Sequence, residues 1–339
     1  MIPYRTRRIL GKIFISILLI AVIVSLILLC WVLWLNRYIR YTRTGAELDF
    51  EMSLDYPAGE LAAPPETTPP VTIYYDEDVT VTLPESAELT QLSGLVITGQ
   101  MLETDFAGVM AQVKTLSAPT AILLDVKNIR GEFFYSTPLG RNNGNIDPAD
   151  MDALIAQIRK SGHYLIARLP AYRDYWYGLE HVNDGIFNPN QMSLWMDEER
   201  CYWLNPNAEG TLTYLISIVT ELRTLGFDEV VFTDFRLPDT DAIYFEQDRA
   251  ETIRKAAEDL VRICTTDRFA LSFVGSETFP LPEGRSRLYA ENVSAADAAA
   301  LAQRLNLEDT QSRLVFLTDL KDTRYDAYSV LRPLELNMQ

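Results

Sequence analysis

Short apolar runs alternate with longer amphipathic segments over residues 90–335. The apolar runs have four to seven residues each, as covered β-strands do, and lie at 95–98, 121–127, 164–169, 230–236, 269–274, 287–290 and 314–318. Segments with helical periodicity lie between them, at 106–116, 147–162, 212–225, 251–264 and 294–305. Strands that alternate with helices in this way predict an α/β fold with a parallel sheet.

End signals support several of these helices. Asp147 and Pro148 are a typical N-cap and first helical residue, and Ser294 with Asp297 has the spacing of a capping box. Gly162 and Gly226 stand where the second and third helices should end.

The stretch 90–339 has about the usual length of one TIM-type (β/α)8 barrel. Seven strands are recognisable and the eighth is not, so we expect a barrel with an irregularity at the eighth strand, which would be short, displaced or absent. An open doubly wound sheet would have the same local pattern and remains the alternative.

The N-terminal region predicts a membrane anchor. Residues 13–35 are uncharged and apolar, which is long enough to span a bilayer, and no clear small-residue cleavage site accompanies them. We therefore expect a cytoplasmic basic segment at 1–12, a transmembrane helix at 13–35 and a proline-rich spacer at 36–89. The barrel domain at 90–339 would then be extracellular. A cleaved signal peptide is the alternative.

Charge is distributed unevenly along the chain. Residues 1–43 hold seven Lys or Arg and no acid, so the net charge of −17 for the whole chain leaves −24 on the remainder. An acidic domain repels phosphate backbones, and we expect no nucleic-acid partner.

Charged residues also stand where predicted strands end. Asp125 and Lys127 share a face of the second strand, Asp234 and Arg236 share a face of the fourth, and Arg168 closes the third. Active sites of barrels lie at this end of the strands, and cleavage of a glycosidic bond needs two carboxyl groups. Asp125 and Asp234 are therefore the candidate catalytic acids, with the three basic residues as candidate substrate contacts. The alternative is that both pairs are structural ion pairs.

The loop after the third strand is rich in aromatic residues. Flat rings with polar tips suit the apolar faces of sugars, and Tyr175 and Trp176 are the candidates for such contacts. For Trp203 we expect packing over the barrel top. Further acids follow later strands and are weaker candidates, namely Glu277, Glu291 and Asp319.

Other chemistries fit the sequence poorly. With only two histidines, a histidine-rich metal site or a Ser-His-Asp triad is not expected, and the glycines at 140 and 144 lack the Lys-Ser/Thr of a phosphate loop. We expect no cofactor and no metal. Cys201 and Cys264 could pair outside the cell, although the sequence does not give their distance.

Four sequence blocks carry a family resemblance. They are Leu124-Asp125-Val126-Lys127 with Arg130-Gly131-Glu132, Tyr164 to Arg168 with Arg173-Asp174, Trp203-Leu204-Asn205-Pro206, and Gly226-Phe227-Asp228-Glu229 through Arg236-Leu237-Pro238. In this order they resemble the bacterial "putative glycosyl hydrolase" domains, which are similar to barrels of the α-amylase superfamily. The resemblance implies a barrel, a carbohydrate substrate, and places for Asp125, Arg236 and Asn205 in the site.

The chain departs from that family at one position. The family has an acid three residues before the arginine of the fourth strand, whereas this chain has Thr233 there and its acid one residue later, at Asp234. Alternation along a strand would turn these two side chains to opposite faces, unless a bulge restores the direction.

Two hypotheses follow from the sequence. The first is a membrane-anchored extracellular glycoside hydrolase that acts on polysaccharide or cell-wall glycan through Asp125 and Asp234. The second is a catalytically silent barrel that binds glycan or organises the cell envelope. In both, the partners are a carbohydrate and, through residues 13–35, the lipid bilayer.

Overall fold

The computed structural model describes residues 25, 31, 39–42, 45–48 and 88–336. The chain divides into two units, Met1–Thr80 and Val81–Gln339. In the first, β1 (Ile39–Thr42) and β2 (Gly45–Leu48) form an antiparallel hairpin. Apart from residues 25 and 31, the expected transmembrane helix lies outside the described residues, as does most of the spacer. Within the described part, no helix has both the length and the apolar character that crossing a bilayer requires.

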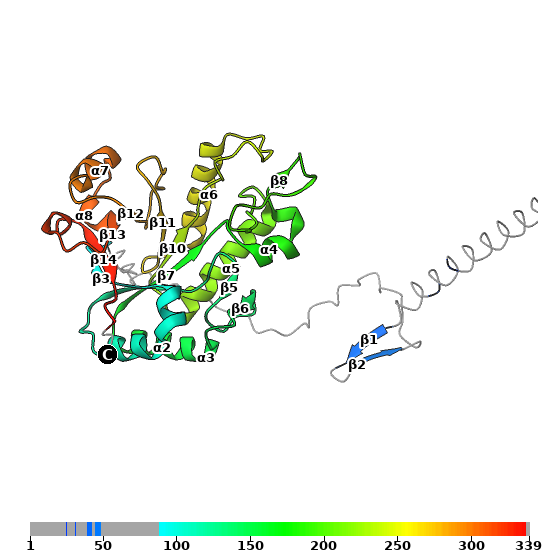
Figure 1. Ribbon diagram of the computed structural model, residues 1–339, viewed down its shortest axis with the longest axis horizontal. Coiled ribbons are helices and arrows are strands. Elements are labelled where there is room, and N and C mark those ends of the chain that lie inside the picture. The colour runs from blue at the N-terminus through cyan, green and yellow to red at the C-terminus, as the bar shows by residue number, and fades with distance from the viewer. Residues whose placement is uncertain (1–24, 26–30, 32–38, 43–44, 49–87, 337–339) are drawn as a thin grey trace, which may run out of the picture. The chain divides into compact units, whose positions relative to one another are not determined.

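The second unit is built around a closed barrel of parallel strands (Figure 1). Around the barrel, β10 is followed by β11, β12, β13, β14, β3, β4 and β7, which pairs again with β10. Closure excludes the open-sheet alternative and supports the TIM-type barrel. In chain order the strands are β3 (Ser93–Ile97), β4 (Ala121–Asp125), β7 (Tyr164–Pro170), β10 (Glu229–Thr233), β11 (Ala270–Val274), β12 (Leu288–Glu291), β13 (Leu314–Leu317) and β14 (Ser329–Pro333).

Helices follow the strands along the chain. They are α2 (Gly99–Val113), α3 (Pro148–Lys160), α5 (Glu209–Leu225), α6 (Arg249–Cys264), α7 (Ala298–Leu305) and α8 (Thr310–Arg313). Three of the residues expected at helix ends are confirmed there. Asp147 caps α3 through its side chain, Pro148 opens that helix, and Gly226 ends α5 in the left-handed conformation with φ of 91°.

Two strand ends carry additional structure. After β4 the short strands β5 (Glu132–Phe133) and β6 (Arg141–Asn142) pair with each other. After β7 comes an insertion with α4 (Tyr175–Glu180), the 3-10 helix η2 (Val182–Asp184) and a small hairpin, β8 (Phe187–Asn188) and β9 (Ser193–Leu194). A second short 3-10 helix, η3 (Thr323–Tyr325), precedes β14.

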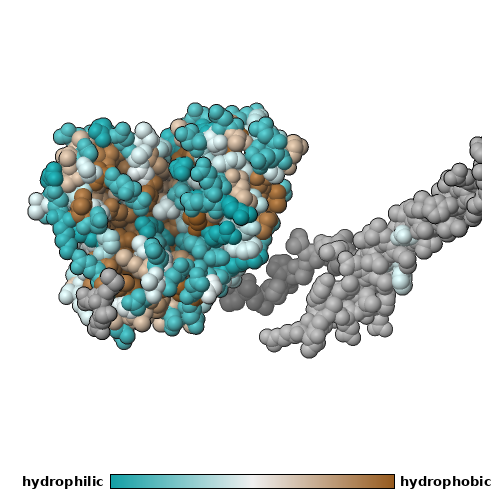
Figure 2. Space-filling view, in the orientation of Figure 1, coloured by the Kyte–Doolittle hydropathy of each residue, from teal (hydrophilic) through white to brown (hydrophobic). Residues whose placement is uncertain are grey.

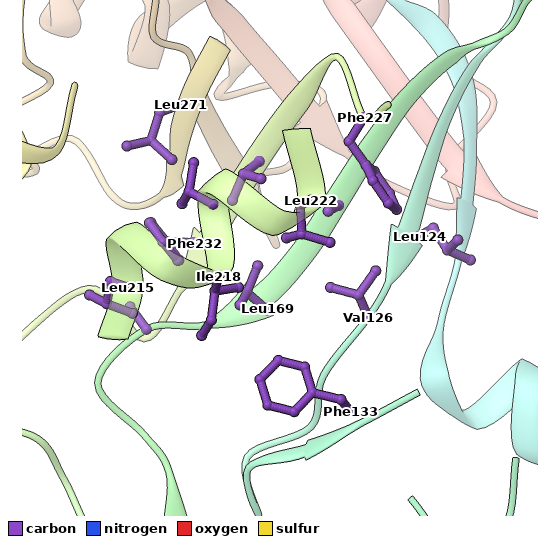
Figure 3. Close-up of a cluster of buried hydrophobic side chains, with 14 of the residues drawn as sticks. Leu124, Val126, Phe133, Leu169, Leu215, Ile218, Leu222, Phe227, Phe232 and Leu271 are labelled. Atoms are coloured by element: carbon purple, nitrogen blue, oxygen red, sulfur yellow. The ribbon is translucent and has the colours of Figure 1, made fainter. Parts of the chain in front are cut away.

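Apolar side chains on the two faces of the strands form separate clusters. Outside the barrel, Ile218 and Leu222 of α5 lie beside Leu169 of β7 and Phe232 of β10 (Figure 3). Inside it, Val231 of β10 belongs to a cluster drawn from neighbouring strands. Because side chains alternate along a strand, the two neighbours of Val231 on its own face, Glu229 and Thr233, also face the barrel interior.

Three expectations need correction. The fourth strand ends at Thr233, not at residue 236, because Asp234 leaves the extended conformation with φ of 50°. The second strand ends at Asp125, two residues earlier than expected. The eighth strand, which the pattern did not reveal, is present as β14 and closes the barrel against β3. Cys201 and Cys264 are both buried and unpaired.

Candidate functional site

Three adjoining hollows open at the carboxyl ends of the barrel strands. Their volumes are about 500 Å³ over β3, β4 and β7, about 620 Å³ over β10 to β12, and about 610 Å³ over β12 to β14. Thr233 lines the first and second, Arg168 the first and third, and Glu291 the second and third. These three residues therefore lie where the hollows meet. Figure 2, drawn in the orientation of Figure 1, shows the surface hollowed between the sides that carry α7 and α6.

Asp125 and Arg168 form a bidentate ion pair at the barrel mouth, the end of the barrel where the three hollows open. They end the inward faces of β4 and β7, and the parallel register places them side by side. Arg168 Nε lies 2.6 Å from Asp125 Oδ1 and Nη2 lies 3.1 Å from Oδ2, which also accepts from the Gly99 amide at 2.8 Å. Burial disfavours the charge on Arg168, but the bonds to Asp125 outweigh it and raise the pKa of the guanidinium.

Glu291 completes this group from the opposite side of the mouth. Its Oε1 accepts from Arg168 Nη1 at 3.3 Å, and 39% of its side chain is exposed. Glu291 ends β12 two residues after Tyr289, which is part of the interior cluster, so it faces inward as well. Arg168 thus connects two carboxylates that come from different strands.

Lys127 lies two residues beyond the end of β4 and contacts the insertion instead of Asp125. Its ammonium is fully buried and lies 2.7 Å from Asp174 Oδ2, so the Asp125–Lys127 ion pair of the structural alternative does not form. Asp174 also accepts from the Tyr214 hydroxyl at 2.9 Å and, through Oδ1, from the Tyr177 amide that opens α4. Lys127 and Asp174 therefore join the β4 end to the insertion, although Lys127 also contributes to the wall of the first hollow.

Asp234 follows β10 in the left-handed conformation, with φ of 50°. Aspartate tolerates this region better than most residues, and sparsely populated conformations are concentrated at functional sites. Burial raises the pKa of Asp234, against the opposing effects of Arg173 and Arg236. Among the described residues, no side chain lies within hydrogen-bond or ion-pair distance of its carboxylate. It lines the second hollow.

Arg236 lies in the same hollow but makes no ion pair with Asp234 in the described part of the chain. Its side chain is exposed, and its guanidinium carbon lies 5.0 Å from the centre of the Trp203 ring. Trp203 itself is buried, as expected from the sequence, and donates to Asp197. The Asp234–Arg236 ion pair of the structural alternative is therefore absent from the described residues, and both side chains remain available to the hollow.

The aromatic candidates lie in the insertion, outside the lining of the three hollows. The Tyr175 ring stacks on Tyr202 with a centroid distance of 5.4 Å, and Arg130 lies 4.1 Å from it. Trp176 is covered by Arg141 at 3.7 Å. The rings are thus in contact with protein groups.

Asn205 is also away from the mouth hollows. Its side-chain oxygen accepts from the Asn207 amide at 3.0 Å in the turn before α5, and its own amide donates to the Asp184 carbonyl at 2.7 Å. These bonds fix the entry to α5.

Two residues that are central to the mouth could not be recognised as such from the sequence. In the sequence, Thr233 stands out only as a departure from the family pattern. In the structure, it faces inward where the first and second hollows meet. Glu291 is a weak candidate from the sequence, because its contact with Arg168 depends on a strand register that the sequence does not give.

The other two weaker candidates lie in different places. Glu277 pairs on the surface with Arg304. Asp319 is exposed and lines the third hollow. Within the described residues no group of three or more His, Cys, Asp or Glu could hold a metal ion.

Solved structures with a similar arrangement include several glycoside hydrolases. The glycoside hydrolase domain of PelA from Pseudomonas aeruginosa aligns with 13% identity, covering 73% of this chain and 96% of that chain, with a TM-score of 0.44. The α-galactosidase TtGalA from Thermus thermophilus aligns with 12% identity over 74% of this chain and 59% of its own, with a TM-score of 0.46. A hypothetical protein from Ruminiclostridium thermocellum reaches 20% identity over 53% of this chain and 96% of its own, with a TM-score of 0.46.

The sequence itself matches a known family. No protein with a curated description matches the chain. Residues 95–269, just over half of the chain, match the family described as "Putative glycosyl hydrolase domain", and this span begins within β3 and ends just before β11. The chain belongs to that family.

Proposed function

We propose that the barrel mouth binds a polysaccharide or cell-wall glycan and hydrolyses its glycosidic bonds. Family membership supports the reaction class. The hollows lie at the end of the barrel where enzymes of this fold have their active sites, and their volumes are in the range of small-molecule sites.

The environment of Asp234 is the observation that carries this proposal. A glycoside hydrolase needs one carboxyl group that retains its proton until it can give it to the departing oxygen. Burial raises the pKa of Asp234, and the carboxyl lines the second hollow without a fixed partner among the described residues. A second carboxyl group must face the anomeric carbon, and Asp125 and Glu291 are both at the mouth.

The test is release of reducing sugar by the purified full-length chain from starch, xylan, chitosan and purified peptidoglycan. We expect Asp234→Asn to lower the rate by a factor of roughly 100 or more, as loss of a general acid does. The matched control is Asp267→Asn, because Asp267 is exposed in the turn that precedes β11, at the opposite end of the barrel. Equal rates for the wild type and Asp234→Asn would overturn the assignment of Asp234.

A catalytically silent glycan-binding barrel is the second candidate. Thr233 favours it, because the inward position at the end of β10 holds a hydroxyl group where the family resemblance implies an acid. A hydroxyl group cannot stabilise a positively charged anomeric carbon as a carboxylate does. In that case calorimetry would show that the full-length chain binds one of the four glycans, and the reducing-sugar assay would show no release of sugar from it.

We also propose that the protein is held in the cell membrane, with the barrel outside the cell. The proposal is supported by the uncharged apolar residues 13–35 and by the basic residues that flank them. Protease added to intact cells should then degrade the barrel domain. Protection of that domain in intact cells, with digestion after lysis, would contradict this topology.

A further inference from the structure

We propose that Glu291, rather than Asp125, is the second catalytic carboxylate, and that Asp125 positions Arg168. This inference rests on the proposed hydrolase function and extends it to a residue that the sequence pattern ranked low. Three features of the mouth carry it: the bonds already made by Asp125, the exposure of Glu291, and the hollow that Glu291 shares with Asp234.

Both oxygens of Asp125 are already in use. Oδ1 accepts from Arg168 Nε at 2.6 Å, while Oδ2 accepts from Arg168 Nη2 and from the Gly99 amide. To act as a base or nucleophile, Asp125 would have to break its bidentate ion pair with Arg168, which is mostly removed from water. Asp125 and Asp234 also line different hollows, over β4 and over β10 respectively.

Glu291 differs from Asp125 in each of these respects. It lines the second hollow together with Asp234, so a sugar bound there can touch both carboxyl groups. Its side chain is 39% exposed, against 19% for Asp125. Its Oε1 accepts a single bond from Arg168, at 3.3 Å, and Oε2 makes no bond to another described residue. One oxygen of Glu291 is therefore free to meet water or substrate.

The resulting step is a hydrolysis in which Glu291 acts as the base. Asp234 gives its proton to the glycosidic oxygen, and the bond from that oxygen to the anomeric carbon breaks with its electron pair left on the oxygen. Glu291 takes a proton from a water molecule whose oxygen forms the new bond to the anomeric carbon. The two carboxyl groups then return to their starting states by proton exchange with solvent.

Arg168 connects the two acids that were considered for this role. Asp125 holds the guanidinium by two bonds, and the guanidinium in turn contacts Glu291 through Nη1. Asp125 thus acts on the reaction through Arg168, by fixing the position of Glu291. Loss of Asp125 should displace Glu291 without removing the catalytic group.

The experiment compares Glu291→Ala and Asp125→Asn in the full-length chain, each with and without sodium azide, on whichever of the four glycans the wild type cleaves. We expect Glu291→Ala to lower kcat by roughly 1,000-fold, within the range for loss of a general base. Azide needs no base, so it should enter the vacated space, restore part of the rate and give a glycosyl azide product. Asp125→Asn should lose activity without recovery in azide.

A matched control is available on the neighbouring barrel strand. Glu277 follows β11, is exposed and pairs with Arg304, but lies outside the lining of the mouth hollows. Glu277→Ala should keep the wild-type rate. Glu291→Gln, which retains an oxygen for Arg168, should be as slow as Glu291→Ala, because an amide cannot accept the proton.

The outcomes separate this inference from the proposed function. A wild-type chain that cleaves none of the glycans overturns the hydrolase function and, with it, the role of Glu291. An active wild type whose Glu291→Ala variant keeps its rate overturns only the assignment of Glu291. Recovery by azide in Asp125→Asn, but not in Glu291→Ala, would return the role to Asp125.

Discussion

Replacing Glu229 by glutamine removes one charge from a buried ion pair at the amino-terminal end of the barrel. The Glu229 carboxylate and the Arg287 guanidinium are paired, with 0% and 1% of their side chains exposed. Tyr164 and Tyr289 each donate to Glu229 at 3.0 Å, and Ser272 donates to it as well. Burial and the adjoining Glu229 raise the pKa of both tyrosine hydroxyls, which therefore remain donors.

The surroundings of Arg287 determine the size of the effect. Besides Glu229, its guanidinium donates to the Ser312 carbonyl at 2.8 Å and to the Thr90 carbonyl at 3.0 Å, but neither acceptor carries a full charge. Loss of one partner from a buried pair costs about 3–5 kcal/mol of unfolding free energy. For a domain of roughly 250 residues that corresponds to a Tm lower by roughly 6–20 °C.

The assay is unfolding of the full-length chain by heat and by denaturant, followed by circular dichroism. The exposed Arg304–Glu277 pair supplies the control, since Glu277→Gln should change the stability by less than about 1 kcal/mol. The double variant Glu229→Leu/Arg287→Met should recover only part of the loss, because it leaves no charge unpaired but removes the acceptor of three buried hydroxyl groups. If Glu229→Gln unfolds at the wild-type temperature, the pair is not in a water-excluded site and the reasoning fails.

Three further predictions concern the mouth and its support. Because burial raises the pKa of Asp234, activity should be lost as pH rises through a value above the ordinary aspartate range. The stability contributed by the protonated group should be lost over the same window, so Asp234→Asn should remove both trends in pH-rate and pH-stability profiles. Thr233→Asp adds a second carboxylate beside Asp234 and should move the alkaline limb of the pH-rate profile upward; an unmoved limb would show that the two side chains do not interact. Gly131→Ala should destabilise the protein by at least about 2 kcal/mol in denaturant unfolding, because φ is +80° and the new Cβ would lie 2.0 Å from Asp174 Oδ1. Gly162→Ala, also at positive φ but with open space around it, should cost only about 1 kcal/mol, and equal losses would exclude the Asp174 clash.

The barrel was largely predictable because seven of its strands are short segments rich in apolar residues. Their composition marks them as strands, and caps such as Asp147 and Gly226 mark helix ends by local chemistry. The eighth strand was not recognisable from the sequence because β14 holds only two apolar residues before Arg332 and Pro333. It is recognised as a strand only through its pairing with β13 and β3, which is a long-range property.

The site was less predictable because its ion pairs join different strands. Sequence spacing suggested partners two residues apart, as for Asp125 with Lys127. Register instead pairs Asp125 with Arg168, and Lys127 turns to Asp174 in the insertion. A spacing rule applies only while the strand continues, and β4 ends at Asp125. The same limit explains Asp234, since its left-handed backbone ends the alternation that the sequence argument assumed.

The two ends of β10 show how a structural carboxylate can be distinguished from a functional one. Glu229 and Asp234 are five residues apart; Glu229 is buried and Asp234 is half-buried. Glu229 accepts bonds from four side chains in the closed interior, so its charge is fully compensated. Asp234 has no such bonds among the described residues and lines a hollow that a ligand can enter. Asp234 is half-buried without such bonds, which disfavours its charged form, and this environment supports the proposed role of Asp234 as a proton donor to a bound substrate.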